Sequence, residues 1–389
     1  MANKTNTKIN NKDYYRITLD LGRNAEGKRV RKQFYGKSKK EAEEKKLEYL
    51  RNSALGIVDN TLYLGKAMND WLYEIKKVEV KASSFERYEG IFRNYLKDSL
   101  ISIMALDKIK PIDIQRYYNE LFKNGKSSSS IKNVHKLLKQ FFAYCEDNNY
   151  IVKTPISGKK VTIPKDSNNT NIKKEVEVFT NEEMKRILSI EENTVIKYAA
   201  LISYATGMRK GEILGLKESD INYKSREINI QRSIVTSTII DDHGNRNKKT
   251  YVSDTKTSNS IRTIPLPNEL ISIIKKVIIL KKEMVLKYGV NLSDEFKDML
   301  FISKEGNFIN SSNFDKSWIS FLKRCSIKHK KFHALRHTYA TRQFESGTQV
   351  LTVSKLLGHS NIDITLDIYT HVLKKEKEKA IDTLSLLSV

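Results

Sequence analysis

A chain of 389 residues is too long for one compact hydrophobic core, so we expect two or three domains, and 39% hydrophobic with 30% charged residues is typical of a soluble globular protein. The 70 Lys and Arg residues outnumber the 46 Asp and Glu residues and give a formal net charge of +24, which favours a polyanionic partner, most often nucleic acid. An anionic membrane surface is the competing partner, but the sequence has neither an apolar run of roughly 18 residues nor an N-terminal signal segment, so we expect a cytoplasmic protein without a membrane partner.

The first 60 residues have the pattern of a small basic domain. Residues 13–36 alternate polar and apolar side chains on either side of RNAEGK, which is typical of a β-hairpin. Ser38 followed by Glu41 forms a capping box, which predicts that a helix begins there. We expect a three-stranded sheet backed by one helix. Residues 1–60 contain fifteen Lys or Arg and eight Asp or Glu, so this domain is a candidate phosphate-binding face; a merely soluble basic tail is the alternative.

The pattern becomes helical between residues 62 and 156. Four segments carry apolar residues at three- and four-residue spacing, namely AMNDWLYEIKK, SFERYEGIFRNYLKD, PIDIQRYYNELFKNG and SSIKNVHKLLKQFFAYCEDNN. Short connections join them, which predicts a four-helix unit. Residues 157–176 are poor in apolar periodicity and are predicted to form a linker.

Residues 177–389 mix helical and strand patterns. A second capping box, Thr180 with Glu183, begins a helix, and a buried-looking helix, VIKYAALISYAT, ends at Gly207. Four strand-like segments follow, REINI, SIVTSTII, KKTYV and SIRTIPL, with the polar turn DDHGN between the second and the third. Long helices return from NELISIIKK onwards. Cys145 and Cys325 are single and far apart, so we expect neither a disulfide nor a metal site.

Four segments of this last region combine side chains suited to phosphate chemistry: TGMRKGEILGL, SDTKTSNSIRTIPL, HALRHTYATRQF and LLGHSNIDITLDIYTHV. Arg209 and Glu212 are three residues apart, which lets the carboxylate brace the guanidinium. His333 and Arg336 have the same spacing, so on a helix they project from one face. Two arginine forks can hold one phosphodiester bidentately and neutralise a pentacoordinate phosphorus transition state without a metal.

Phosphoryl transfer also needs a nucleophile and a proton donor. Tyr369 follows His359 of a Gly-His-Ser turn by ten residues. A tyrosine hydroxyl has an ordinary pKa of about 10, so nearby guanidinium or imidazole groups must activate it. Lys256, in the turn before SIRTIPL, can act as the general acid that protonates a departing 5′ oxygen. A core-packing role is the alternative for Tyr369.

Taken together, the four segments resemble the active site of the tyrosine recombinases, including the TG-[LM]-R-x-x-E and LGH-S…Y-T-H signatures. The matching positions are Arg209, Lys256, His333, Arg336, His359 and Tyr369, with Glu212 in support. The resemblance covers about 210 residues and implies a 3′-phosphotyrosine intermediate. It also implies that arginines and histidines stabilise the phosphorus centre, that the lysine protonates the leaving oxygen, and that no metal, ATP or other cofactor takes part.

The remaining chain is similar to other parts of the same family. Residues 62–156 resemble its helical core-binding domain, and residues 1–60 resemble the arm-binding module of integrases from phages and Gram-positive conjugative transposons. The implied fold is multidomain and mainly α with small β-sheets, ending in the α+β catalytic domain. The implied partners are double-stranded DNA attachment sites of core and arm types and a homotetramer on two duplexes, with an excision factor and a DNA-bending protein as candidate accessories.

Several alternatives stay open at this point. Either His333 or His359 can be the imidazole that handles the proton. The general acid can instead be one of three other basic residues, Lys248, Lys249 or Lys282. The apolar stripe of the C-terminal tail can pack on its own subunit or on a neighbour. Two rival functions are a type IB topoisomerase and a DNA-binding regulator that has lost the chemistry.

Overall fold

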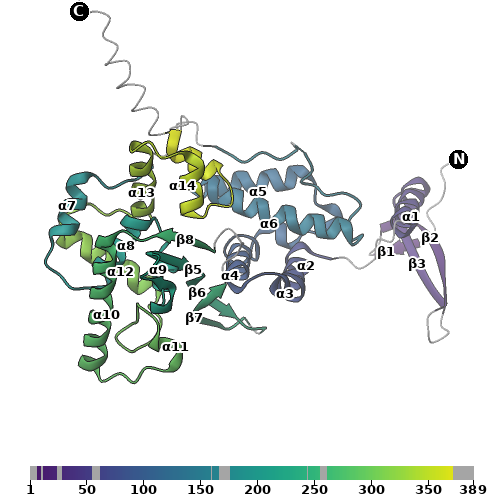
Figure 1. The fold of residues 1–389 in the computed structure, drawn as a ribbon. Helices are drawn as coiled ribbons and strands as arrows, with labels where there is room; N and C mark the ends of the chain where they lie inside the picture. The colour runs from purple at the N-terminus through teal and green to yellow at the C-terminus, as the bar shows by residue number, and fades with distance from the viewer. Residues whose placement is uncertain are drawn as a thin grey trace, which may run out of the picture. The chain divides into compact units, whose positions relative to one another are not determined.

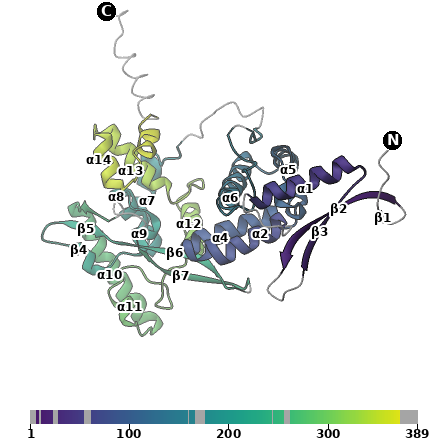
Figure 2. The ribbon, with the colours of Figure 1, turned by 90° about the vertical axis from the view of Figure 1, so that its right-hand side faces the viewer.

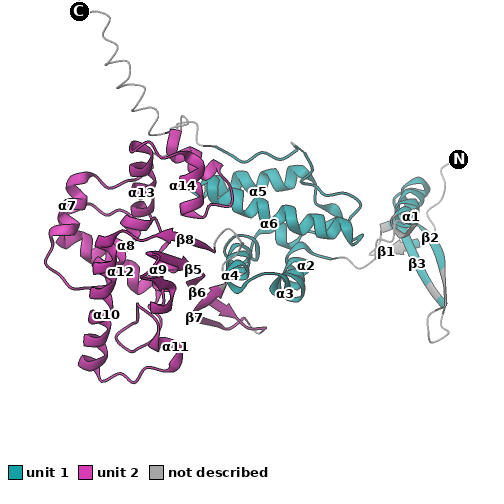
Figure 3. Cartoon of the chain, in the orientation of Figure 1, with its two compact units in different colours: residues 1–170 teal, residues 171–389 magenta. Residues whose placement is uncertain are grey.

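The computed structural model describes residues 7–9, 12–23, 29–54, 62–158, 160–165, 176–242, 244–254 and 261–370. The chain divides into two compact units, Met1–Thr170 and Asn171–Val389, which are coloured separately in Figure 3. Within the described residues, no helix is both long enough and apolar enough to cross a bilayer.

The N-terminal part is the predicted small sheet with one helix. Its strands are β1 (Thr7–Ile9), β2 (Lys12–Arg23) and β3 (Arg29–Gly36), antiparallel in the order β1-β2-β3, and α1 (Lys39–Ala54) follows. Residues 24–28 of the expected hairpin turn lie outside the described residues. Ser38 Oγ accepts from the Glu41 amide at 3.2 Å, as in the predicted capping box, whereas the Glu41 carboxylate accepts from the Lys37 amide at 2.7 Å.

Four helical stretches make up residues 64–147, as the apolar periodicity predicts. They are α2 (Leu64–Asp70), continued by η1 (Trp71–Lys76) and α3 (Lys77–Glu79); α4 (Ala82–Ile91), continued by η2 (Phe92–Leu96); α5 (Pro111–Lys123); and α6 (Ser128–Asp147). Two short 3₁₀ turns, η3 (Leu100–Ile103) and η4 (Leu106–Lys108), precede α5. Trp71 is buried and meets Phe141 edge-on at 5.5 Å between ring centroids, so the first and last stretches share one core.

The second unit contains two small antiparallel sheets. One has the order β4-β5-β8, formed by β4 (Ile221–Asn222), β5 (Glu227–Ile230) and β8 (Arg262–Pro265). The other is the hairpin of β6 (Arg232–Ile240) and β7 (Arg246–Asp254). All four strand-like segments of the sequence are therefore strands.

The second unit also contains helices. They are α7 (Asn181–Ser189), α8 (Val195–Thr206), α9 (Lys210–Leu214), η5 (Glu218–Asp220), α10 (Asn268–Tyr288), α11 (Asp294–Lys297), α12 (Ser311–Arg324), α13 (Ala334–Glu345) and α14 (Val350–Leu357), and residues 363–370 are also helical. The capping box predicted at Thr180 and Glu183 is present at the start of α7.

Helix α8 is the centre of the second unit. It contacts α9, α10, α12 and α13, and these helices gather around it in both ribbon views (Figures 1 and 2). Eight of its twelve residues are buried, which explains why its sequence is apolar on all sides. The C-terminal end of α8 therefore lies in the protein interior next to α13, where the candidate site is built.

Candidate active site

Arg209, the first candidate arginine, follows a glycine turn at the end of α8. Gly207 has φ +66°, a left-handed conformation that ends the helix as predicted. A Cβ at this position would lie 2.6 Å from both Leu357 Cδ2 and Tyr339 Cδ1, so α13 and α14 can approach the turn only because residue 207 has no side chain. Two residues later, Arg209 is the N-cap of α9.

Glu212 braces Arg209, as the three-residue spacing predicts. The Arg209 Nη1 donates to Glu212 Oε1 at 2.8 Å and the Arg209 amide donates to Oε2 at 2.9 Å. The Glu212 side chain is only 4% exposed. Burial alone would raise the pKa of this carboxyl, but hydrogen bonds and positive charge from Arg262 and Arg209 outweigh it and lower the pKa to about 2. The carboxylate is therefore charged at any physiological pH.

Arg262 of β8 is the second partner of this carboxylate, and the sequence reasoning did not select it. Its Nη1 and Nη2 donate to Glu212 Oε1 and Oε2 at 3.1 and 2.8 Å. A signal was present in the sequence, because Arg262 lies two residues from the buried Ile264 and so shares its face of the strand. A guanidinium on a core-facing position needs a buried acceptor.

Arg336 and His333 come from the start of α13. His333 is the N-cap, and Arg336 lies in the first turn and is 2% exposed. The Arg336 Nη1 donates to the Gly207 carbonyl at 2.8 Å and Nη2 donates to the Leu357 carbonyl at 2.7 Å. Burial, followed by the charge of Arg209, lowers the pKa of Arg336 to about 9. Its positive charge is therefore poorly compensated, and an anion would stabilise it.

The C-terminus of α14 holds the three arginines in a row. The consecutive carbonyls of Leu356, Leu357 and Gly358 accept from Arg262 at 2.7 Å, Arg336 at 2.7 Å and Arg209 at 3.1 Å, respectively. The last carbonyls of a helix have no partner within it and carry the negative end of its dipole, so cations are favoured there. Of the three arginines, Arg209 has the most accessible side chain, at 37% exposed.

The two histidines lie next to these guanidinium groups. Burial, then the charges of His337, Arg336 and Arg209, lowers the pKa of His333 to about 4. Burial, then the charges of Arg336 and Arg209, lowers the pKa of His359 to about 3. Both imidazoles are therefore neutral at pH 7, so each can accept a proton and also donate a hydrogen bond.

The tyrosine-bearing helix is anchored beside His359. The fully buried Thr365 places its Oγ1 2.7 Å from His359 Nδ1. Thr365 and Tyr369 are four residues apart on helix 363–370, so they share one face. The half-buried Tyr369 ring meets Phe344 edge-on at 5.1 Å. Thr365 was also missed in the sequence, although its spacing from Tyr369 could have indicated it.

The remaining candidate is the general acid. Lys256 lies outside the described residues, in the segment between β7 and β8. Of the alternatives, the Lys248 ammonium donates to Ser312 Oγ at 2.8 Å, while Lys249 and Lys282 are exposed. The structure thus brings together Arg209, Glu212, His333, Arg336 and His359, and ties the helix of Tyr369 to them.

Comparison with known proteins shows the family of the chain. Residues 177–376, about half of the chain, match the family model described as Phage integrase family. The chain belongs to the phage integrase family. It is a tyrosine recombinase, an enzyme of site-specific recombination that cleaves and rejoins DNA strands. Residues 63–122 match the N-terminal SAM-like domain of phage integrases, and the fold predicted from the sequence is confirmed.

This recombinase is similar to the following two proteins and one solved structure. A tyrosine recombinase XerC-like protein of Caldanaerobacter subterraneus is 45% identical over 392 residues, covering 100% of both chains. The transposase of transposon Tn916 from Enterococcus faecalis is 25% identical over 72% of this chain and 68% of its own length. The Tn1549 transposon integrase, solved in complex with a circular intermediate DNA, shares the fold with a TM-score of 0.65 at 20% identity over 82% of this chain and 99% of its own.

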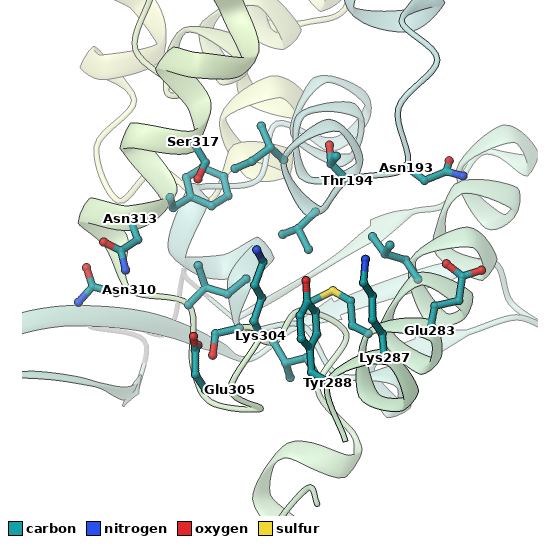
Figure 4. Close-up of a pocket in the computed structure, with 18 of the residues that line it drawn as sticks. Asn193, Thr194, Glu283, Lys287, Tyr288, Lys304, Glu305, Asn310, Asn313 and Ser317 are labelled. Atoms are coloured by element: carbon teal, nitrogen blue, oxygen red, sulfur yellow. The ribbon is translucent and has the colours of Figure 1, made fainter. Parts of the chain in front are cut away.

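A cavity of about 780 Å³ lies elsewhere in the catalytic unit of the recombinase. Figure 4 shows Tyr288, Lys287 and Lys304 among its lining side chains, with the two ammonium nitrogens 5.8 and 5.7 Å from the Tyr288 ring centroid. None of the candidate catalytic residues that the structure describes lines it. The cavity is therefore separate from the arginine cluster.

Proposed function

We propose that this recombinase is an integrase that moves a mobile element into and out of a chromosome through a 3′-phosphotyrosine intermediate. The observation that carries the proposal is the convergence of Arg209, Arg336, His333 and His359 at the C-terminus of α14. These groups have surplus positive charge in a largely buried place, which is the environment that a phosphodiester complements.

The roles follow from the chemistry of each group. Tyr369 Oη attacks phosphorus, so that an Oη–P bond forms and the P–O5′ bond breaks. Arg209 and Arg336 bind the nonbridging oxygens, exchanging backbone carbonyls for phosphate oxygens as acceptors. Lys256 gives its proton to the departing 5′ oxygen. The tyrosine proton passes to an imidazole, and both His333 and His359 are neutral at pH 7, so each has a ring nitrogen that can accept it.

The rest of the chain supplies DNA contacts in this proposal. Residues 1–60 bind arm-type sites, residues 62–156 bind core-type sites, residues 157–176 link them to the catalytic domain, and residues 177–389 form that domain with its tail. Similarity to the Tn916 transposase and to a Tn1549 integrase bound to DNA supports double-stranded attachment sites as substrates. A homotetramer on two duplexes, an excision factor and a DNA-bending protein complete the assembly.

A covalent-trapping assay tests the proposal. Nicked duplexes built from the ends of the genetic element that encodes the protein are incubated with the full chain, with Tyr369→Phe and with Tyr288→Phe as a matched control from the cavity. We expect an adduct resistant to denaturant in the wild type and in Tyr288→Phe. Tyr369→Phe should form none while binding the duplex within about twofold of the wild type.

The other outcomes separate the rival functions. An adduct in Tyr369→Phe would move the nucleophile to another tyrosine. Tight binding without an adduct in the wild type would favour a regulator. Relaxation of supercoiled DNA without joints between two duplexes would favour a type IB topoisomerase.

A further inference from the structure

We propose that Arg262 is a positioning residue that ties Glu212 to the C-terminus of α14 and so fixes Arg209 relative to His359. The inference rests on the proposed function, because its consequence is the geometry of the phosphate site. Arg262 contacts Glu212 with both Nη atoms and the Leu356 carbonyl with Nε, at 3.1, 2.8 and 2.7 Å. Its side chain is 7% exposed and all three guanidinium nitrogens donate to these partners, so Arg262 acts through them.

Two short series of contacts connect Arg262 with Arg209 and with the segment that carries His359. On one side, Glu212 Oε1 accepts from both Arg262 Nη1 and Arg209 Nη1, so the two guanidinium groups are held by one oxygen atom. On the other side, Leu356 is three residues before His359, and Gly358 between them has φ +65° and accepts from Arg209. Arg262 therefore completes a ring of contacts that connects Arg209, a proposed phosphate-binding residue, with the segment that carries His359, a candidate proton acceptor.

Only arginine has the donors that this position requires. A guanidinium presents five N–H donors in a fixed plane, and here that plane faces two carboxylate oxygens and one carbonyl at once. A lysine ammonium keeps the charge but is a point donor that cannot hold the three acceptors in fixed relative positions. The strand keeps the arginine in place, because Arg262 is paired with Ile230 of β5.

The chain offers a matched control in Arg232. This arginine also begins a strand, is largely buried, and pairs with the buried Asp220. Its Nη1 also donates to the Gly215 carbonyl at 3.4 Å, and neither Asp220 nor Gly215 belongs to α14. Replacing Arg232 by Lys perturbs a buried arginine–carboxylate pair of the same unit and leaves the contacts of Arg262 with Glu212 and the C-terminus of α14 in place.

The test compares Arg262→Lys with Arg232→Lys in the full chain. Adduct formation is measured at saturating nicked duplex, binding by fluorescence anisotropy, and stability by urea unfolding. We expect Arg262→Lys to slow adduct formation by about 10- to 100-fold with binding within about twofold of the wild type, because small displacements of catalytic groups carry losses of this size. Arg232→Lys should lose stability without a comparable loss of rate. Equal slowing of both variants, or a loss of binding alone, would overturn the proposal.

A double-mutant cycle checks the path through Glu212. If Arg262 acts through this carboxylate, Arg262→Lys should slow adduct formation far less in a Glu212→Gln background than in the wild type. Additive losses would mean that Arg262 acts on another group and would refute the stated path.

A measurement independent of DNA keeps this proposal separate from the proposed function. The imidazole resonances of the seven histidines are recorded by NMR, and His359→Asn assigns the signal of His359. We expect Arg262→Lys to shift that signal and Arg232→Lys to leave it in place. A wild-type chain that forms no adduct would refute the integrase mechanism, while the His359 signal would still decide the role of Arg262.

Discussion

Replacing Glu212 by Gln should remove an electrostatic contribution to the stability of the catalytic unit. The pKa of Glu212 is about 2 in the folded chain, whereas the ordinary pKa of a glutamate side chain is 4.5. At about 1.4 kcal/mol per pKa unit, this difference corresponds to about 3 kcal/mol of stability at neutral pH. A pKa lowered by folding stabilises the folded state above about pH 4.5, and the contribution is lost as the pH falls towards about 2.

The two tryptophans allow this stability to be measured in the full chain. Trp71 belongs to the first unit and Trp318 to the core of the second, so in a Trp71→Phe background the remaining fluorescence reports the catalytic unit alone. Urea unfolding should place Glu212→Gln about 3 kcal/mol below its parent near pH 7, and the gap should shrink by about 1.4 kcal/mol by about pH 3.5. A gap below about 0.5 kcal/mol, or one that does not change with pH, would refute the reasoning.

Two further predictions concern the general acid and the glycine turn. Lys256→Ala should abolish adduct formation on ordinary duplexes and regain it on duplexes with a 5′-bridging sulfur, a leaving group that needs no proton; failure of this rescue would assign the acid to another residue. Gly207→Ala should destabilise the catalytic unit in urea unfolding by about 2 kcal/mol or more, because the added Cβ meets Leu357 and Tyr339 at 2.6 Å. Gly289→Ala is the control, since Gly289 has φ +61° with nothing within 4 Å of the added atom, and an equal loss in both variants would mean that backbone strain alone is responsible.

The structure also explains which site residues the sequence could reveal. Arg209 and Glu212 are three residues apart, so one helical turn is enough to bring their side chains together, and the contact is present. Arg262 contacts Glu212 across 50 residues and Leu356 across 94, and no local spacing encodes either contact. Its place on the core-facing side of β8 indicated only that it needed an acceptor, not which one.

The sequence by itself determined the elements and the chemical groups of this recombinase. Hydrophobic periodicity, capping boxes and Gly207 depend on interactions within a few residues, so the strands, the helices and the end of α8 could be predicted from them. The tertiary structure alone decided that three arginines meet the last carbonyls of α14, because Arg336 reaches Gly207 across 129 residues and Leu357 across 21. Such contacts depend on how α8, α13 and α14 pack, and packing is a property of the whole core rather than of any one segment.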